Sequence, residues 1–466
     1  MPDFVDALAA SVGMAAPGLR ILVSLLLQYP LAIGMAQLAT SSAVVKHAYA
    51  ALSGAALLYF NFGPTMAHNV FTVLVTWLAL AALPRKAAVA FVFVFQCAYL
   101  LVGYWFVSTD GYDVDWTLPQ CILCLRLIGL AWDVFDGGKD VSTLRTDQLA
   151  NHIVDTPGLL EVFGFALFFP TILTGPQLPF SRYRAFVANK LSDVVDGSAI
   201  APARLQAAAW RAAAGRFLLG AVYLAAVTVF EGLFPASLLQ ELTAMPLWRA
   251  IFVLTVIGNV GLRKYIGIWL INEGSCIVSG IALDLNDGVK GKATDVSQIN
   301  FGAAANVLPY LFETATNINH KIGSFNINTN DWTKRYVFKR LMWVGNKDVS
   351  TIAALTFLSL WHGFKAGYAF TFSFEFVALL LQQRIIARHI QLGLDKSAIY
   401  AGVVCYTAVV LISGYAYVPF ITNTWEKTVG MFSGVSWYYH AIVVGWLAVE
   451  LAIESTKPKT KPKKAD

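Results

Sequence analysis

A histidine inside an apolar run is the strongest candidate for chemistry in this sequence. His362 lies in the segment Leu-Trp-His-Gly-Phe-Lys-Ala-Gly-Tyr, after a stretch rich in asparagine, lysine and arginine. An ionisable side chain at membrane depth is energetically costly, so it is a functional-site hypothesis by default. A neutral imidazole can act as a general base near pH 7. On residue types alone, the same histidine could equally be a hydrogen-bonded core residue.

An asparagine-rich segment before His362 offers a second reactive group. A side-chain amide can donate hydrogen bonds to a developing oxyanion. The candidates are Asn317, Asn319, Asn326, Asn328 and Asn330. Any of them could instead cap a helix, so composition does not choose among them.

Two spaced motifs around these groups resemble the membrane-bound O-acyltransferase family. The family's Trp-His-Gly-x-x-x-Gly-Tyr pattern occupies residues 361–368 here. Its second motif is Glu, eleven residues, Trp-Asn, two residues, Thr, two residues and Trp. The matching positions are Glu313, Phe325, Asn326, Thr329 and Trp332. Phe325 stands where the family usually has Trp, which resembles the lysophosphatidylcholine acyltransferase type 3 branch.

A third family element, Trp-Asp, matches Trp132-Asp133, so the resemblance extends from about residue 130 to 375. It implies an all-α polytopic membrane protein, a bundle of about ten to twelve transmembrane helices around an intramembrane catalytic chamber. It implies transfer of an acyl group, polyunsaturated in that branch, from acyl-CoA to the free hydroxyl of lysophosphatidylcholine and related lysophospholipids in phospholipid remodelling. His362 is then the general base, and Asn326 hydrogen-bonds in the active site. Acyl-CoA is a co-substrate, and no cofactor is implied.

Two alternatives to this function stay open. Other members of the family act on sterols, diacylglycerol or proteins. A lipid transporter without catalysis would also explain buried polar residues.

Five residues are expected to line the substrate site: Trp361, Tyr368, Glu375, Thr329 and Trp332. Glu375 interrupts the apolar run 366–382, where a buried hydrogen-bond anchor is an equal alternative. For Trp132-Asp133, a structural interface pair is favoured. The remaining histidines, His320, His389 and His440, are expected at the surface or in packing.

Four cations follow the asparagine segment, and they could meet the phosphates of coenzyme A. They are Lys334, Arg335, Lys339 and Arg340. They scatter around a helix, so ordinary charge on the cytosolic side is favoured.

The composition is that of a polytopic membrane protein. Hydrophobic residues make up 57% and charged residues 13%, with a mean hydropathy of +0.60, whereas soluble proteins average about a quarter charged. The net charge is +6, and the last ten residues carry five lysines against one aspartate. No nucleic-acid partner is therefore indicated. The five cysteines include Cys121-x-x-Cys124, for which core packing is favoured over metal or redox chemistry.

Apolar runs predict the transmembrane organisation, since a span needs about 20 residues. The long runs are 19–38, 44–61, 65–83, 87–106, 216–235, 249–271, 397–420 and 430–453. Shorter runs are 117–135, 160–174, 350–362 and 366–382. We expect one transmembrane acyltransferase domain over 1–456 and a disordered lysine-rich tail over 457–466. The polar stretch 284–349 is expected to contain short helices.

Charge asymmetry predicts the orientation. Basic residues in 384–396 and in the tail place both in the cytosol, opposite the balanced loop 421–429. Donor phosphates must stay in cytosolic water, while the lysophospholipid and other membrane lipids lie in the bilayer. A cytosolic tunnel and a separate lateral opening are therefore expected.

The chain ends in Lys463-Lys464-Ala465-Asp466, which resembles a dilysine retrieval signal of the endoplasmic reticulum. We therefore expect a multi-pass protein of that membrane. A homodimer stays open.

Overall fold

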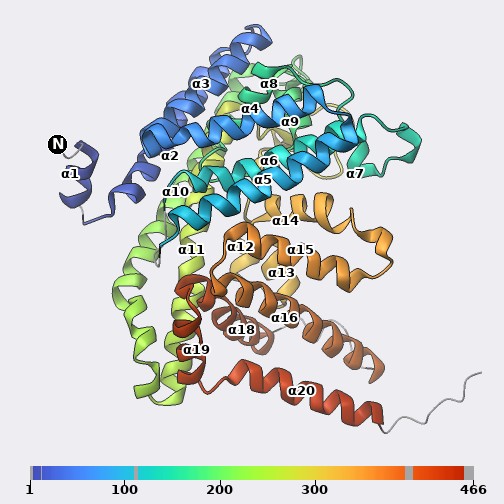
Figure 1. Cartoon of the computed structure of the whole chain (residues 1–466). Coiled ribbons are helices and arrows are strands. Elements are labelled where there is room, and N and C mark those ends of the chain that lie inside the picture. Colours follow the sequence, from blue (N-terminus) through green and yellow to red (C-terminus); the bar gives the residue numbers. More distant parts are fainter. Residues whose placement is uncertain (1–3, 12, 110–113, 394–401, 456–466) are drawn as a thin grey trace, which may run out of the picture. The chain divides into compact units, whose positions relative to one another are not determined.

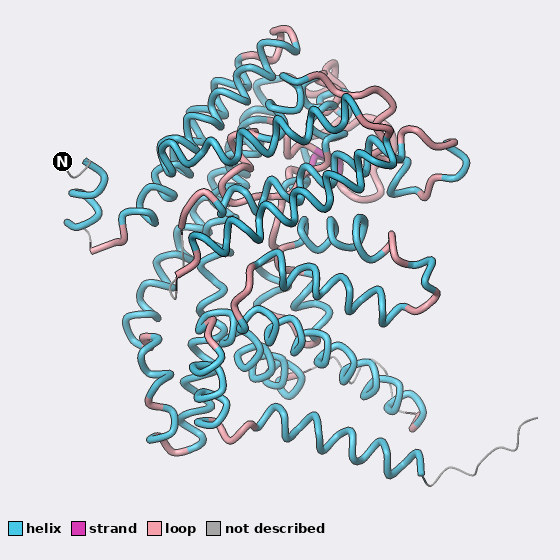
Figure 2. Tube along the Cα trace, viewed as in Figure 1, coloured by secondary structure: helices cyan, strands magenta, loops and turns pink. Residues whose placement is uncertain are grey.

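The protein is almost entirely helical. The computed structural model describes residues 4–11, 13–109, 114–393 and 402–455. Within them, the strands are β1 (Asp284–Leu285) and β2 (Ile299–Asn300), which pair antiparallel with Asp284 opposite Asn300 (Figure 2). The predicted all-α class is confirmed.

Eight helical stretches in the described residues are long and apolar enough to cross a membrane. They are Ala16–Gln37, Ala43–Ala82, Arg85–Val107, Thr117–Asp136, Pro202–Leu233, Leu247–Ser279, Ala366–Gln391 and Val403–Thr422. Trp425–Gly434 and Tyr438–Ile453 are bent by 73° and make nine if they form one broken span.

This number is lower than the expected ten to twelve, for two physical reasons. The 3₁₀ turn Gly63–Met66 joins α3 (Ala43–Phe62) to α4 (Ala67–Ala82), so two expected spans form one helical stretch. The runs 160–174 and 350–362 give helices of 8 and 16 residues, α8 (Leu159–Ala166) and α15 (Lys347–His362). Both are short for the hydrocarbon core of about 30 Å.

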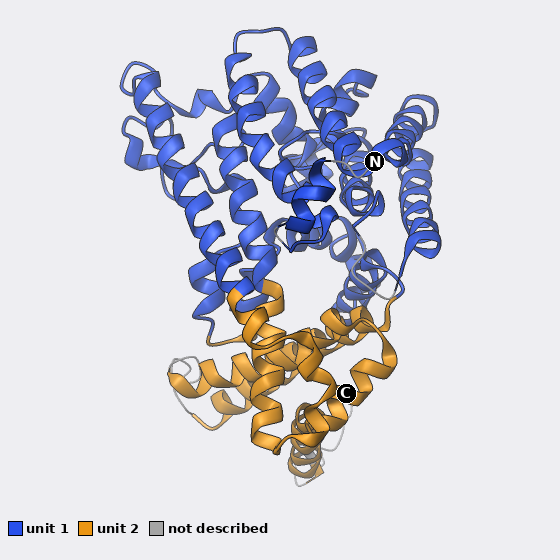
Figure 3. Ribbon diagram, turned by 90° about the vertical axis from the view of Figure 1, so that its left-hand side faces the viewer, with its two compact units in different colours: residues 1–228, 263–315, 319–364 blue, residues 229–262, 316–318, 365–466 orange. Residues whose placement is uncertain are grey.

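The chain divides into two compact units, drawn in different colours in Figure 3. Unit 1 contains residues 1–228, 263–315 and 319–364, and unit 2 contains 229–262, 316–318 and 365–466. Each unit has an apolar core of its own. The lysine-rich tail 457–466 lies outside the described residues, and a single domain over 1–456 stays a prediction.

The long helices come before and after the polar stretch 284–349, which contains short elements (Figure 1). The first helices are α1 (Phe4–Ser11), α2 (Ala16–Gln37), α3, α4, α5 (Arg85–Val107), α6 (Thr117–Asp136), α7 (Thr146–Leu149), α8, α9 (Phe180–Val187), α10 (Pro202–Leu233) and α11 (Leu247–Ser279). α10 and α11 each contribute residues to both units. The helices of unit 2 that follow are α16 (Ala366–Gln391), α18 (Val403–Thr422), α19 (Trp425–Gly434) and α20 (Tyr438–Ser455).

Helix α6 is the most buried of the candidate spans, because 78% of the residues in its apolar 18-residue segment are buried. Its sequence is apolar on every side, which is typical of a helix in the core. It packs against α4, α5, α8 and α9. Three charged side chains lie in it nevertheless: Arg126, Asp133 and Asp136. Buried charges need partners. Arg126 donates to the carbonyls of Phe165, Ala166 and Thr171. Asp133 and Asp136 have partners in the polar stretch described next.

The polar stretch 284–349 contains short helices, as predicted. They are α12 (Pro309–Glu313), α13 (Ile318–Gly323), α14 (Ile327–Thr333) and the π-helical turn Lys334–Phe338. In that turn the N–H of Lys339 donates to the carbonyl of Lys334 at 2.9 Å. A π-helical turn holds one more residue than an α-helical turn, and it follows directly on the helix that Asn326 precedes.

Candidate active site

Asn326 lies immediately before α14 in a left-handed backbone conformation, with φ 50° and ψ 44°. Asparagine adopts this region more readily than most other side chains. Its side chain forms no capping hydrogen bond with α14. The helix-cap alternative therefore does not describe Asn326.

The neighbouring asparagines use their amides on the backbone. Asn328 Nδ2 donates to the Ala305 carbonyl at 2.8 Å. Asn330 Nδ2 donates to the Phe325 carbonyl at 2.9 Å. Within the part of the chain that the structure describes, Asn326 Nδ2 donates no hydrogen bond to protein. Of these three, Asn326 is thus the one whose amide N–H groups can serve a substrate.

His362 is the last residue of α15, and Gly363 ends the helix with φ 119°. A glycine is favoured there because side chains disfavour this positive φ. The imidazole of His362 is partly exposed and lies edge-on to the indole of Trp361, with ring centroids 4.6 Å apart.

Trp361 joins the end of α15 to two core helices. Its Nε1 donates to the Cys121 carbonyl of α6 at 2.8 Å, and Tyr104 of α5 donates from its hydroxyl to the Trp361 carbonyl at 3.1 Å. These bonds position the residue beside His362, so the indole has a structural role in addition to any contact with substrate.

Trp332 connects α14 to α15 and to α6. Its indole stacks on Phe357 of α15, with ring centroids 5.5 Å apart and planes at 22°. A Cβ at Gly129 of α6 would lie 2.9 Å from Trp332 Nε1, so the absence of a side chain there permits the approach. Thr329 and Trp332 are each 6% exposed. Both are packing residues of α14, and substrate contact stays a prediction for them.

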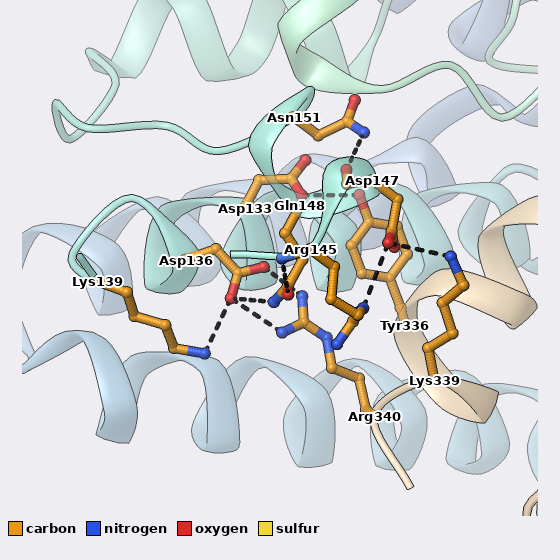
Figure 4. Close-up of polar contacts among 10 residues, drawn as sticks. All are labelled: Asp133, Asp136, Lys139, Arg145, Asp147, Gln148, Asn151, Tyr336, Lys339 and Arg340. Carbon is orange, nitrogen blue, oxygen red and sulfur yellow. Dashed lines mark hydrogen bonds and ion pairs between the residues drawn. The ribbon is translucent and has the colours of Figure 1, made fainter. Parts of the chain in front are cut away.

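A polar network joins the end of α6 to the segment after α14 (Figure 4). The Tyr336 hydroxyl donates to Asp133 Oδ1 at 2.8 Å. Arg340 Nη1 donates to Asp136 Oδ1 at 2.9 Å, and the Arg340 guanidinium lies 4.2 Å over the Trp132 ring. Trp132-Asp133 is therefore an interface pair, as favoured from the sequence.

Further polar side chains complete this network. Gln148 and Lys139 donate to Asp136 at 2.9 and 3.2 Å. Lys339 lies 3.0 Å from Asp147, and Arg145 lies 3.3 Å from the same carboxylate. Burial works against the Asp147 carboxylate, but the hydrogen bonds from Lys339 and Arg145 lower its pKa below the usual value. Lys339 and Arg340 are thus ion-pair partners inside the protein, which neither interpretation of the four cations had foreseen.

Burial, together with the adjacent Asp133 carboxylate, raises the pKa of the Tyr336 hydroxyl well above its ordinary value. Tyr336 therefore stays protonated and donates to Asp133.

The sequence contained a signal for this network. Two acidic residues, Asp133 and Asp136, end an apolar run, and the basic segment 334–340 had no assigned partner. Their pairing could not be read from local spacing.

A small cavity of about 50 Å³ lies between α6 and α14. Its walls include Arg126, Gln177 and Trp332. Arg126 Nε, Gln177 Oε1 and Trp332 Nε1 are buried without a hydrogen-bond partner among the described residues. The cavity wall therefore offers both donors and an acceptor next to the Asn326 helix.

Glu313, the first residue of the second motif, links α12 to α10 and α11. Arg263 Nε donates to its Oε1 at 3.0 Å, and Tyr223 donates from its hydroxyl at 3.2 Å. Nearby, Lys321 Nζ donates to the Phe312 carbonyl at 3.0 Å, and burial lowers the Lys321 pKa to about 8.

Phe325, the residue that departs from the family pattern, packs in the same region. Its ring centroid lies 4.9 Å from that of Trp269 and 5.3 Å from that of Phe312. The backbone before Asn326 is thereby attached to α11 and α12.

Two expected substrate residues belong to unit 2. Tyr368 on α16 is 8% exposed and lies edge-on to Phe420, with centroids 5.0 Å apart. Glu375, also on α16, has no hydrogen bond or ion pair to another described residue, which leaves the anchor alternative without support. Substrate contact stays a prediction for both. A Cβ at Gly367 would overlap the Pro419 carbonyl of α18, so this motif glycine permits close helix packing.

The other candidates occupy packing or surface positions. His440 packs among aromatic rings, and its Nδ1 lies 2.8 Å from the Tyr415 hydroxyl. His320 is exposed on α13. Cys121 and Cys124 are free thiols, and Cys124 is buried in the core of unit 1. These placements agree with the favoured interpretations.

Known proteins resemble this chain over nearly its whole length. The model of the membrane-bound O-acyltransferase family matches residues 101–419. Lysophospholipid acyltransferase 5 of Rattus norvegicus is 34% identical over 458 residues, covering 95% of this chain and 90% of the relative. The protein of that name from Homo sapiens is 34% identical over 459 residues, covering 96% and 91%. That from Drosophila melanogaster is 33% identical over 460 residues, covering 95% and 89%.

Proposed function

The chain belongs to the membrane-bound O-acyltransferase family, and we propose that it is a lysophospholipid acyltransferase. The observation that carries this proposal is the similarity to lysophospholipid acyltransferase 5 over 95% of the chain, which includes both motif segments. The donor in our proposal is acyl-CoA. The acceptor is the free hydroxyl of lysophosphatidylcholine or a related lysophospholipid.

The proposed reaction is a direct acyl transfer. The acceptor hydroxyl oxygen bonds to the acyl carbon, the carbon–sulfur bond of the thioester breaks, and the products are a phospholipid and free coenzyme A. His362 takes the proton from the hydroxyl as general base and passes it to the departing thiolate. Asn326 donates a hydrogen bond to the oxygen that becomes negative during attack.

The packing of the two candidate groups supports this assignment. Asn326 precedes α14 and His362 ends α15, and these helices contact each other through Trp332 and Phe357. Both are fastened to α6, since Trp332 packs on Gly129 and Trp361 bonds to Cys121. Stable positioning of reacting groups is what an enzyme requires, and a lipid carrier without catalysis would have no use for it.

The protein is a multi-pass membrane protein. An acceptor already dissolved in the bilayer suits an enzyme built from apolar helices. A preference for polyunsaturated acyl chains and a cytosolic C-terminus in the endoplasmic reticulum membrane belong to the same proposal. They are supported by the family branch and by the distribution of lysine and arginine, respectively.

The test is an acceptor screen with the purified protein and one radiolabelled acyl-CoA. Lysophosphatidylcholine, lysophosphatidylethanolamine and lysophosphatidylserine are compared with diacylglycerol and cholesterol. We expect label in phospholipid, and a rate lower by about 10²–10⁴-fold with the His362→Ala protein. Label confined to triacylglycerol or sterol ester, or no transfer to any acceptor, would overturn the proposal.

A further inference from the structure

We propose that Asn306 is a positioning residue that sets the direction of the Asn326 amide. This inference rests on the proposed role of Asn326. Asn306 is 4% exposed and lies between the turn Gly302–Ala304 and α12. Its Nδ2 donates to Asn326 Oδ1 at 3.2 Å.

The orientation of both amides follows from one backbone group. The backbone N–H of Asn328 can only donate, and it points at Asn306 Oδ1 at 3.1 Å. That contact identifies the oxygen of Asn306, so its nitrogen is the atom that faces Asn326. A nitrogen donor requires an acceptor, and the facing atom of Asn326 is therefore its oxygen.

This arrangement leaves the Asn326 nitrogen for the reaction. A carboxamide is planar, and its oxygen and nitrogen are separate arms of one trigonal carbon that point in different directions. Fixing the oxygen against Asn306 therefore aims the Nδ2 donors away from the protein contact. An oxyanion needs donors, and an amide turned the other way would present an oxygen to it.

The backbone keeps the two asparagines in register. The N–H of Ile327 donates to the Asn306 carbonyl at 3.0 Å, and the N–H of Leu308 donates to the Ser324 carbonyl at 2.9 Å. Val307 and Phe325 form an antiparallel bridge between these bonds. Backbone pairing of residues 306–308 with 324–327 therefore holds the side chains of Asn306 and Asn326 next to each other.

The discriminating variant is Asn306→Asp. The carboxylate still accepts from the Asn328 N–H, but it cannot donate to Asn326. It attracts the Asn326 nitrogen instead and turns that amide over. We expect kcat to fall by about 10²-fold, near the loss of an oxyanion donor, with KM for both substrates within about twofold.

Asn300→Asp is the matched control. Asn300 is exposed, and its Oδ1 accepts from the Gly302 N–H at 2.6 Å. An aspartate there keeps that bond and adds the same charge six positions away in the sequence. Wild-type kcat is expected for the control.

A double variant separates positioning from general damage. If Asn306 acts through Asn326, then Asn306→Asp in an Asn326→Ala background lowers kcat no further. An additional loss in that background would overturn the inference. The inference would also be overturned if Asn306→Asp kept wild-type kcat while Asn326→Ala was inactive. That result would leave the proposed function intact. Wild-type activity of Asn326→Ala instead overturns the proposed site.

If Asn306→Asp does not fold, Asn306→Ala replaces it. This change removes the bond to Asn326 and the two bonds that Asn306 Oδ1 accepts from Asn328. The Asn326 amide is then free to rotate, so kcat should fall by about tenfold, consistent with the loss of a neutral hydrogen bond. The Asn306→Ala, Asn326→Ala protein should match Asn326→Ala alone. Unchanged kcat for a folded Asn306→Ala protein contradicts the inference.

Discussion

Asp136 and Arg340 are 204 residues apart in the sequence and form a two-point ion pair at the end of α6. The Asp136 side chain is 1% exposed, and the Arg340 side chain is 11% exposed. The contact attaches the segment after α14 to the same helix that receives the Trp361 hydrogen bond. One core helix thereby carries both segments that contain the candidate catalytic residues.

Breaking this pair should destabilise the protein strongly. Asp136→Asn leaves the Arg340 guanidinium buried without a counter-charge, which costs about 3–5 kcal/mol. The midpoint of thermal unfolding in detergent measures the loss. Asp147→Asn is the control, because its partly exposed pairs contribute about 0–1 kcal/mol. Equal shifts for the two variants would contradict the assignment of Asp136–Arg340 as the dominant pair.

Removing the proposed base should slow turnover strongly without unfolding the protein. For His362→Ala we expect kcat to fall by about 10²–10⁴-fold, the usual contribution of general-base catalysis. Binding of acyl-CoA to the purified variant should persist. The control is His320→Ala, since His320 is exposed on α13. A folded His362→Ala protein with near-wild-type activity would refute the role.

Asparagine substitutions should separate catalysis from stability. Asn326→Ala should lower kcat by about 10²–10³-fold, and Asn326→Gly should do the same while keeping the left-handed backbone free of strain. Asn330→Ala loses hydrogen bonds to two backbone carbonyls, so it should lower the unfolding midpoint and spare kcat. A larger loss of kcat for Asn330→Ala than for Asn326→Ala would contradict the catalytic role of Asn326.

The buried side chain of Lys321 should make the free energy of unfolding depend on pH. Its pKa is about 8 in the fold and 10.5 ordinarily, because burial disfavours the charged form. Between these values the unfolded chain binds more protons than the folded one, so the free energy of unfolding rises with pH. Thermal unfolding across that window should show wild type gaining stability relative to Lys321→Met.

The control for this measurement is Lys347→Met, since Lys347 is exposed. Its difference from wild type should not change over the same pH window. A wild-type advantage over Lys321→Met that shrinks with rising pH would contradict the predicted sign.

The dilysine expectation concerns residues outside those that the structure describes. Replacing Lys463 and Lys464 by Ser should move the protein beyond the endoplasmic reticulum, as seen by microscopy of the full chain. Replacing Lys457 and Lys459 by Ser removes the same charge and should not. Complete retention of the first variant would show that the signal is unnecessary.

Local pattern was enough to predict the helical class and the short helices of 284–349. Motif spacing selected Asn326 and His362 as the candidate catalytic residues, and that assignment stays a prediction. Local pattern did not reveal that Gly63–Met66 continues a helix, because a turn with Gly and Pro usually ends one. It favoured ordinary cytosolic-side charge for Lys339 and Arg340, because their partners lie about 200 positions away.

Asn306 was missed for a related reason. It is one asparagine among several in a polar stretch, and nothing in its immediate sequence distinguishes it. Its importance comes from the pairing of Val307 with Phe325, which brings its amide to Asn326. Contacts made by the side chains of paired segments become visible only after the fold is known.

The π-helical turn Lys334–Phe338 makes the number of residues in this segment as important as their identity. Trp332, Tyr336 and Arg340 are spaced four apart, and all three face α6. In a regular α-helix, positions four apart drift around the axis by about 40° at each step. Deleting Val337 would convert the wide turn to a regular one and rotate Arg340 by about 100° away from Asp136. A related sequence with one residue fewer in this segment would therefore not place its residue at position 340 against Asp136, even if an alignment paired the two positions.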